Sequence, residues 1–158
     1  LTAQYLLLRF PNDVRRREQA WELSRFVEDQ FICWERPSRT NGLGPRYTGF
    51  EKLWVQNDYC DWAGPGVCEQ YHCYHLIDSS AALCIKTWLL LYRMTSDPVL
   101  LAKARALGDA IVNVQDPDGR IPTHWNRSKF KDHDYDWVNC IIESANALTE
   151  LAKYGADD

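Results

Sequence analysis

The segment from Asp78 to Gln115, DSSAALCIKTWLLLYRMTSDPVLLAKARALGDAIVNVQ, decides the fold of this chain. Its first part, residues 78–94, is apolar on nearly every face, which is typical of a helix that is buried on all sides. Its second part is apolar on one face only, at Leu100, Ala104, Leu107, Ile111 and Val114. The segment therefore predicts an inner helix followed by an outer helix that runs to about Gln115.

A very short turn joins these two helices. Asp97 is the expected N-cap of the second helix, and Pro98 stands at its first position, where the missing N–H of proline is not needed. Asp78, which is followed by two serines, is the expected cap of the first helix. Two helices joined in this way form an α/α-hairpin.

Helices are also expected on both sides of this hairpin. Residues 4–10 read as the tail of a helix cut short by Pro11, and Asn12 or Asp13 is the expected cap of a helix that runs to about Trp34. The apolar positions of that second helix are Val14, Trp21, Phe26, Val27 and Phe31. A last helix is expected over 136–154, with Gly155 as its stop. Its expected buried stripe is Trp137, Ile141, Ala145, Leu148 and Ala152.

Two irregular stretches separate the helices. Residues 35–77 carry five of the eight glycines, and we expect a long functional loop there with short helical turns around residues 50–55. Residues 116–119, Asp-Pro-Asp-Gly, predict a turn that opens a second irregular stretch up to residue 135.

The composition limits the class of protein. The chain has 158 residues, of which 46% are hydrophobic, so residues 1–158 are expected to form a single globular domain with one core. The net charge is −4 with both signs interspersed, and we expect no nucleic-acid partner because no basic stripe is present. Asp78 and Lys86 interrupt the apolar run 76–94, which favours a buried helix over a membrane span, so no membrane partner is expected.

The six cysteines do not suggest a disulfide scaffold. Cys33, Cys84 and Cys140 lie in helical patterns among apolar residues, where buried thiols act as small hydrophobic groups. A chain of this size can form a hydrophobic core without disulfides. The first residue is Leu and not Met, so we expect that an N-terminal segment has been removed, and the sequence assigns no cellular compartment.

Three short motifs resemble those of the six-hairpin glycosidase superfamily. They are Tyr92-Arg93-Met94-Thr95-Ser96-Asp97-Pro98, Leu101-Ala102-Lys103-Ala104 and Gln115-Asp116-Pro117-Asp118-Gly119. The resemblance covers residues 70–154, about half of the chain, and Ser96 stands where that superfamily usually has glycine. It implies an all-α fold of helical hairpins, in which this chain forms about half of an (α/α)6 toroid. It also implies a carbohydrate-active protein whose catalytic funnel is lined by the loops leading into the inner helices.

The loop before Asp78 carries the first group of candidate site residues. Glycoside hydrolysis needs two carboxyl groups, one protonated and one ionised, and Asp58, Asp61 and Glu69 could supply that pair. Helix capping or a surface charge is the other interpretation of each carboxylate. Aromatic rings and imidazoles nearby could bind a sugar by stacking and hydrogen bonding. The expected substrate-binding residues of this loop are Trp62, Tyr71, His72 and His75.

The loop before Asp136 carries the second group. His124 is a candidate acid–base residue, and Trp125 and Trp137 are candidate stacking platforms. The acidic cluster between Asp132 and Asp136 reads as solvated or as a helix N-terminal cap. A glycoside hydrolase or a polysaccharide lyase acting on an oligosaccharide is the leading functional hypothesis. For the aromatic rings of the loops, the alternative to sugar stacking is that they seal the long loops onto the helices.

Metal chemistry is a rival hypothesis. Cys60, Cys68 and Cys73 with Glu69 faintly resemble the zinc ligands of some toroid arabinofuranosidases, although their spacing matches no closed zinc motif. The motif Asp58-Tyr59-Cys60 with His124 also loosely resembles the zinc site of toroid prenyltransferases. Zinc is therefore the only cofactor that the sequence suggests.

A non-catalytic helical-hairpin interaction module is the alternative from a different class. It predicts dispersed, solvated carboxylates, whereas the enzyme hypothesis predicts carboxyl groups within about 10 Å of each other. A half toroid would also expose two apolar flanks. We expect Leu6, Leu7, Ile142 and Leu148 to lie on those flanks, covered by a second copy or by the remainder of a longer chain.

Overall fold

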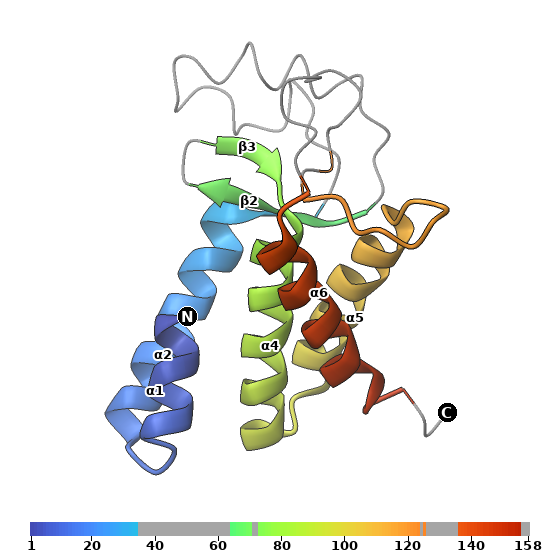
Figure 1. Ribbon diagram of the computed structural model, residues 1–158. Coiled ribbons are helices and arrows are strands. Elements are labelled where there is room, and N and C mark those ends of the chain that lie inside the picture. Colours follow the sequence, from blue (N-terminus) through green and yellow to red (C-terminus); the bar gives the residue numbers. More distant parts are fainter. Residues whose placement is uncertain (35–63, 71–72, 124, 126–135, 156–158) are drawn as a thin grey trace.

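The computed structural model describes residues 1–34, 64–70, 73–123, 125 and 136–155 (Figure 1). Within these residues the chain is mostly helical, as predicted, and it also contains a small sheet that the sequence did not predict. The helices are α1 Thr2–Arg9, α2 Val14–Phe31, α4 Asp78–Thr95, α5 Pro98–Asn113 and α6 Val138–Ala152. The strands are β1 Ile32–Cys33, β2 Gly66–Gln70 and β3 Cys73–Leu76.

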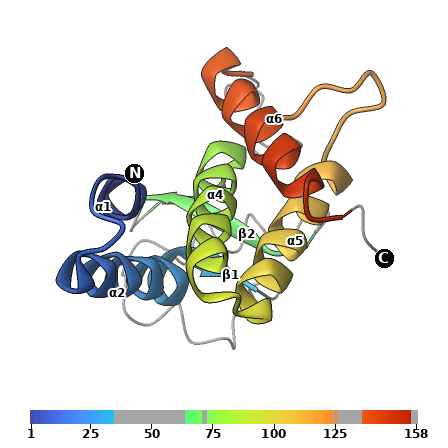
Figure 2. The ribbon, with the colours of Figure 1, turned by 90° about the horizontal axis from the view of Figure 1, so that it is seen from below.

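Helix α4 stands at the centre of the molecule, with α1 and α2 on one side and α5 and α6 on the other (Figure 2). It contacts α1, α5, α6 and β2. Ile85, Trp88, Leu89 and Leu91 are at most 2% exposed, whereas Leu83, Lys86 and Leu90 are half-buried and Arg93 is exposed. Helix α4 is therefore an inner helix, as predicted, but one stripe of it is only partly buried.

The turn between α4 and α5 has the predicted chemistry. The side chain of Asp97 accepts a hydrogen bond from the N–H of Val99 at 3.0 Å, and Pro98 opens α5. Ser96 ends α4 in the left-handed conformation, with φ of 58°, and its N–H donates to the carbonyl of Tyr92. This conformation favours glycine because it has no Cβ. Ser96 therefore occupies a position that strains any residue with a side chain.

The predicted stripe of α5 is confirmed, but that of α6 is wrong. Leu100, Ala104, Leu107 and Ile111 are all buried, and Val114 is half-buried. In α6 the buried residues are instead Cys140, Ser144 and Ala147. The expected positions Trp137, Ala145 and Ala152 are exposed, whereas Ile141 and Leu148 are half-buried.

Gly108 on α5 is the physical reason for this rotation of α6. A Cβ at Gly108 would clash with Leu151 and contact Leu148, so the missing side chain admits both leucines of α6 into the contact with α5. Helix α6 consequently turns the face that carries Leu148 and Leu151 toward α5, and the face with Ser144 toward α4. The apolar periodicity of α6 alone could not predict this, because it does not show that a glycine of α5 lies opposite.

Helix α1 packs against α4 within the chain. Leu6 and Leu7 are buried within the chain, which corrects the expectation that they lie on an open flank. The side-chain amide of Gln4 reinforces this contact, since it donates to the carbonyl of Leu83 at 2.9 Å and to the Thr87 hydroxyl at 3.1 Å. Of the residues expected on the flanks, Ile142 is exposed.

Helix α2 begins as predicted, and three of its five predicted apolar positions, Trp21, Val27 and Phe31, are half-buried. Asp13 is its N-cap and accepts a hydrogen bond from the N–H of Arg16 at 3.1 Å. The predicted apolar positions Val14 and Phe26 are exposed, and the buried residues are Ala20 and Ser24. The half-buried ion pair between Glu28 and Lys103, at 2.6 Å, links α2 to α5.

The strands form a three-stranded antiparallel sheet with the order β1-β2-β3. Ile32 pairs with Val67, and Cys68 pairs with Leu76. Strands β2 and β3 lie in the stretch 35–77 that was expected to be irregular, whereas the helical turns expected around residues 50–55 lie outside the described residues.

In the described part of the chain, no helix is long and apolar enough to span a membrane.

Candidate functional site

The described parts of the two loop regions that the sequence singles out, residues 64–70 and 73–77 of the first and 120–123, 125 and 136 of the second, lie at one end of the molecule (Figure 1). We call it the loop end, because α2 and α5 end there and α4 and α6 begin there. Strands β2 and β3 also lie at this end. A direct contact joins the two regions, since the N–H of Trp125 donates to the carbonyl of Leu76 at 3.1 Å.

A buried carboxylate, Asp78, lies at the first turn of α4. Its side chain is fully buried and accepts hydrogen bonds from the N–H of Ser79 at 2.7 Å and from the hydroxyl of Ser144 at 3.0 Å. Burial raises the pKa of Asp78 to about 6, although the Ser144 and Ser79 hydrogen bonds act in the opposite direction, and the charge of Asp136 raises it further. The predicted role of Asp78 as the helix cap is wrong, because Ile77 is the N-cap of α4 and Asp78 is already its first residue; Asp78 instead links α4 to α6.

Thr123 connects Asp78 to the beginning of α6. Its carbonyl accepts a hydrogen bond from the N–H of Asp78 at 3.2 Å, and its hydroxyl accepts one from the N–H of Trp137 at 2.8 Å. Thr123 is itself fully buried. The beginnings of α4 and α6 are therefore held at a fixed separation by a chain of buried polar contacts.

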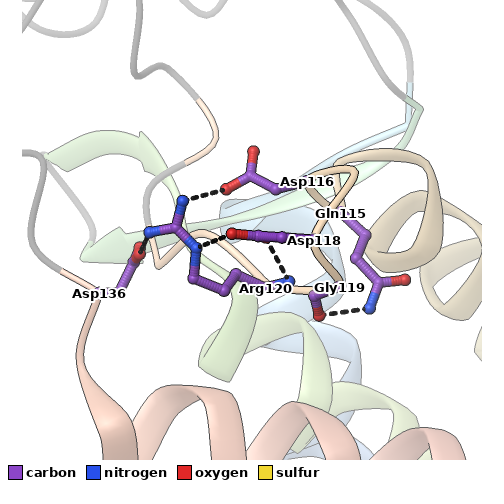
Figure 3. Close-up of polar contacts among 6 residues, drawn as sticks. All are labelled: Gln115, Asp116, Asp118, Gly119, Arg120 and Asp136. Carbon is purple, nitrogen blue, oxygen red and sulfur yellow. Dashed lines mark hydrogen bonds and ion pairs between the residues drawn. The ribbon is translucent and has the colours of Figure 1, made fainter.

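Arg120 forms the exposed counterpart of this buried chain (Figure 3). Its guanidinium contacts Asp118 at 2.7 Å, Asp136 at 3.3 Å and Asp116 at 3.7 Å. The backbone N–H and the guanidinium of Arg120 lower the pKa of Asp118. Because Asp136 directly precedes Trp137, Arg120 links the turn after α5 to the beginning of α6.

The turn itself has the predicted form. Gly119 has a φ of 88°, and its N–H donates to the carbonyl of Asp116 at 2.8 Å. The side chain of Gln115 donates to the carbonyl of Gly119 at 2.6 Å (Figure 3). The Asp-Pro-Asp-Gly motif therefore orients the carboxylates that surround Arg120.

Two predicted stacking residues lie at the loop end. Trp137 is 43% exposed and directly follows Asp136. Trp125 is half-buried, and its ring packs over Gly66 on β2, where a Cβ would come within 2.9 Å of it. Gly66 is thus required by close packing, and Trp125 fixes the second loop region against the sheet.

The other candidate residues divide into two groups. Glu69 lies on β2 and His75 lies on β3, so the backbone brings both to the loop end. The candidates that lie outside the described residues are Asp58, Asp61, Trp62, Tyr71, His72 and His124. The separation of Asp58, Asp61 and Glu69 therefore stays a prediction.

The zinc hypothesis also stays a prediction. Cys68 lies on β2 and Cys73 on β3, whereas Cys60 lies outside the described residues. Within the described part of the chain, no group of three or more His, Cys, Asp or Glu side chains is arranged to hold a metal ion. The thiol of Cys68 contacts Cys33 on the neighbouring strand instead.

Sequence reasoning missed Ser144, Thr123 and Arg120 as parts of the site. Ser144 could have been noticed, since it is a polar residue four positions after Cys140 on what proved to be the buried face of α6. Thr123 and Arg120 had no such signal, because they lie in an irregular segment without periodicity.

No family model, curated protein or solved structure matches this chain. The class of protein that the described residues define is a mostly helical domain with hairpins around a buried central helix.

Proposed function

We propose that this chain is part of a carbohydrate-active protein with a saccharide site at its loop end. One observation carries the proposal: the described parts of both loop regions, with Glu69, Trp125 and Trp137, lie at the end where α4 and α6 begin, joined by the contact between Trp125 and Leu76 (Figure 1). The central position of α4, which is largely buried among α1, α5, α6 and β2, also supports the wider proposal of an α/α toroid.

The accessible side chains suggest a division of roles. The exposed ring of Trp137 is a platform on which a sugar can stack, because aromatic faces match the apolar faces of sugars. Asp136, next to it, is partly exposed and oriented by Arg120. Glu69, with Asp58 or Asp61, would supply the carboxyl pair that cleavage of a glycosidic bond requires, and His124 would assist proton transfer.

The charge around Arg120 favours a hydrolase of neutral sugars over a lyase. Three carboxylates, Asp116, Asp118 and Asp136, contact this one guanidinium. Arg120 is therefore already neutralised, and the surrounding negative charge would repel the carboxylate of an acidic sugar. We expect neutral oligosaccharides to be the better substrates.

A panel of neutral and acidic oligosaccharides tests the proposal. Glycan-array binding measures affinity, new reducing ends report hydrolysis, and unsaturated products report lyase activity. The variants are Glu69→Gln and Trp137→Ala, with Glu22→Gln and Tyr5→Ala as controls, because those two residues are exposed on α2 and α1. We expect Glu69→Gln to abolish turnover. We expect Trp137→Ala to weaken saccharide binding about tenfold, which corresponds to a loss of about 1.4 kcal/mol in binding free energy. Equal binding by all four variants would contradict the proposal.

A non-catalytic interaction module is the second candidate function. The observation that favours it is the number of large apolar side chains exposed on the α1–α2 hairpin, including Tyr5, Leu8, Val14 and Phe26. Such a surface is typical of a protein interface. If the variants at Tyr5 and Phe26 lose a protein partner while no saccharide binds, this function replaces the first.

We also propose that the exposed apolar side chains of α1 and α6 are covered in the functional assembly, by a second copy or by further polypeptide. Leu8 on α1 and Val138 and Ile142 on α6 are each more than half exposed. Light scattering of the chain and of a Leu8→Glu, Ile142→Glu variant tests self-association. A dimer that the double substitution dissociates supports a second copy, and a monomer in both cases favours further polypeptide.

A further inference from the structure

Two cysteines from distant parts of the sequence meet on the small sheet. Cys33 lies on β1 and is paired with Gly66 on β2, so Cys68 stands two residues farther along that neighbouring strand. Residues two apart on a strand share a face of the sheet. The side chain of Cys68 also hydrogen-bonds that of Cys33.

One of these thiols is accessible through a cavity. A largely apolar cavity of about 300 Å³ lies between α1, α2, α4 and β2, and its walls include Cys68, Cys84, Val67 and Trp88. Cys33, in contrast, is only 6% exposed. A small oxidant can therefore approach Cys68 from the cavity, and Cys33 on the neighbouring strand is the hydrogen-bond partner of the thiol that would be oxidised.

The surroundings of the thiols favour Cys33 as the nucleophile of the second step, after Cys68 has been oxidised. The hydrogen bond from Cys68 lowers the pKa of Cys33, which increases its thiolate fraction and therefore its reactivity. Burial raises the pKa of Cys84 to about 12, so the second cysteine of the same cavity stays protonated and inert.

We propose that Cys33 and Cys68 are a modification site at which hydrogen peroxide forms an intramolecular disulfide. The Cys68 thiolate attacks one peroxide oxygen, the O–O bond breaks, and hydroxide leaves, which produces a sulfenic acid. The Cys33 thiolate then attacks that sulfur, the S–S bond forms, and a second hydroxide leaves. With the two thiol protons counted, one peroxide is reduced to two waters while the two cysteines lose two electrons.

The disulfide would cross-link two separate parts of the fold. It joins β1, directly after α2, to β2, which packs on α4, and it closes the segment 34–67 into a loop. A cross-link over a loop of this length raises thermal stability by restricting the unfolded chain, and we expect an increase in Tm on the order of 10 °C. This inference is independent of the saccharide site.

The experiment oxidises the full chain with one equivalent of hydrogen peroxide after removal of reductant. Intact mass spectrometry detects the loss of two hydrogens, and a digest with trypsin and chymotrypsin identifies the linked peptides, since chymotrypsin can cut after Trp62 between Cys60 and Cys68. Thermal unfolding is measured before and after oxidation, and again after treatment with dithiothreitol. The variants Cys33→Ser and Cys68→Ser are compared with Cys84→Ser, which removes a thiol from the same cavity.

The expected result is a disulfide between Cys33 and Cys68 in the wild type and in Cys84→Ser, its absence in the other two variants, and a rise in Tm that dithiothreitol reverses. Pairing of Cys68 with any other cysteine overturns the proposal, and so does a wild type that forms no disulfide. The peptide map of the wild type decides the question even if Cys33→Ser fails to fold.

Discussion

The two helical hairpins of this chain, α1–α2 and α4–α5, are alike in local chemistry and different in burial. In both, an aspartate accepts a hydrogen bond from the first turn of the second helix, namely Asp13 in α2 and Asp97 in α5. Yet α4 buries Trp88, Leu89 and other large side chains, whereas α2 buries only Ala20 and Ser24. Hairpin formation is thus a local property, but the burial of a hairpin depends on how many neighbours surround it.

The difference also determines where the candidate site lies. The beginnings of α4 and α6 are held together by buried polar contacts through Asp78, Ser144 and Thr123. The α1–α2 hairpin is tied to the rest by more exposed contacts, such as the half-buried pair of Glu28 and Lys103. A precise site therefore belongs to the α4–α6 side, because buried and fully partnered groups hold their positions.

The largest expected effect compares a leucine of α4 with a phenylalanine of α2. Leu89→Ala is expected to lower the free energy of unfolding by about 3–5 kcal/mol, because it leaves a cavity in the core. Phe26→Ala is expected to lower it by less than about 1 kcal/mol, since Phe26 is 53% exposed. Urea unfolding of both variants measures this contrast, and equal losses would show that the two hairpins are equally buried in solution.

The next effect concerns the buried polar end of α4. The pKa of Asp78 is raised in the folded state, so the wild type loses stability as pH rises from about 4 to about 6. Asp78→Asn keeps acceptors and donors toward Ser79 and Ser144 but carries no charge. The variant should match the wild type near pH 4 and be more stable by about 3 kcal/mol above pH 6. A difference in unfolding free energy that is independent of pH would contradict the raised pKa.

A smaller effect tests the link between the two hairpins. Glu28→Gln is expected to lower the free energy of unfolding by about 1 kcal/mol, because its ion pair with Lys103 is partly shielded from water. The exposed pair of Glu22 and Arg25 on the same helix is the control, and Glu22→Gln should change stability by only a few tenths of a kcal/mol. If 0.5 M NaCl abolishes the difference between the two variants, the Glu28 pair is no better shielded than its control.

The smallest effect compares the turns of the two hairpins. Ser96→Gly should raise the free energy of unfolding by about 0.5 kcal/mol, because glycine relieves the left-handed strain but has more freedom in the unfolded chain. Asn12→Gly in the other turn should be neutral or destabilising, since Asn12 has no positive φ. A destabilised Ser96→Gly variant would mean that this turn is not strained in solution.

Much of the helical framework was predictable because its signals are local. Caps such as Asp13 and Asp97 and the strictly one-sided stripe of α5 depend on residues within a few turns of each other. The candidate site was predictable only in outline. Loop composition singled out Glu69, Trp125 and Trp137, which the fold brings to the same end of the molecule, but not Arg120 or Thr123, whose partners lie in other segments.

By itself, the sequence determined the buried inner helix, the tight turn at Asp97 and Pro98, and the Asp-Pro-Asp-Gly turn, because each follows from short-range sterics, capping and hydrophobic periodicity. Only the tertiary structure decided which face of α6 is buried and that Cys33 meets Cys68 across the sheet. The reason is physical: the close approach of α5 and α6 at Gly108 and the pairing of β1 with β2 join residues far apart in the chain, and no local pattern encodes which distant partner a residue will contact.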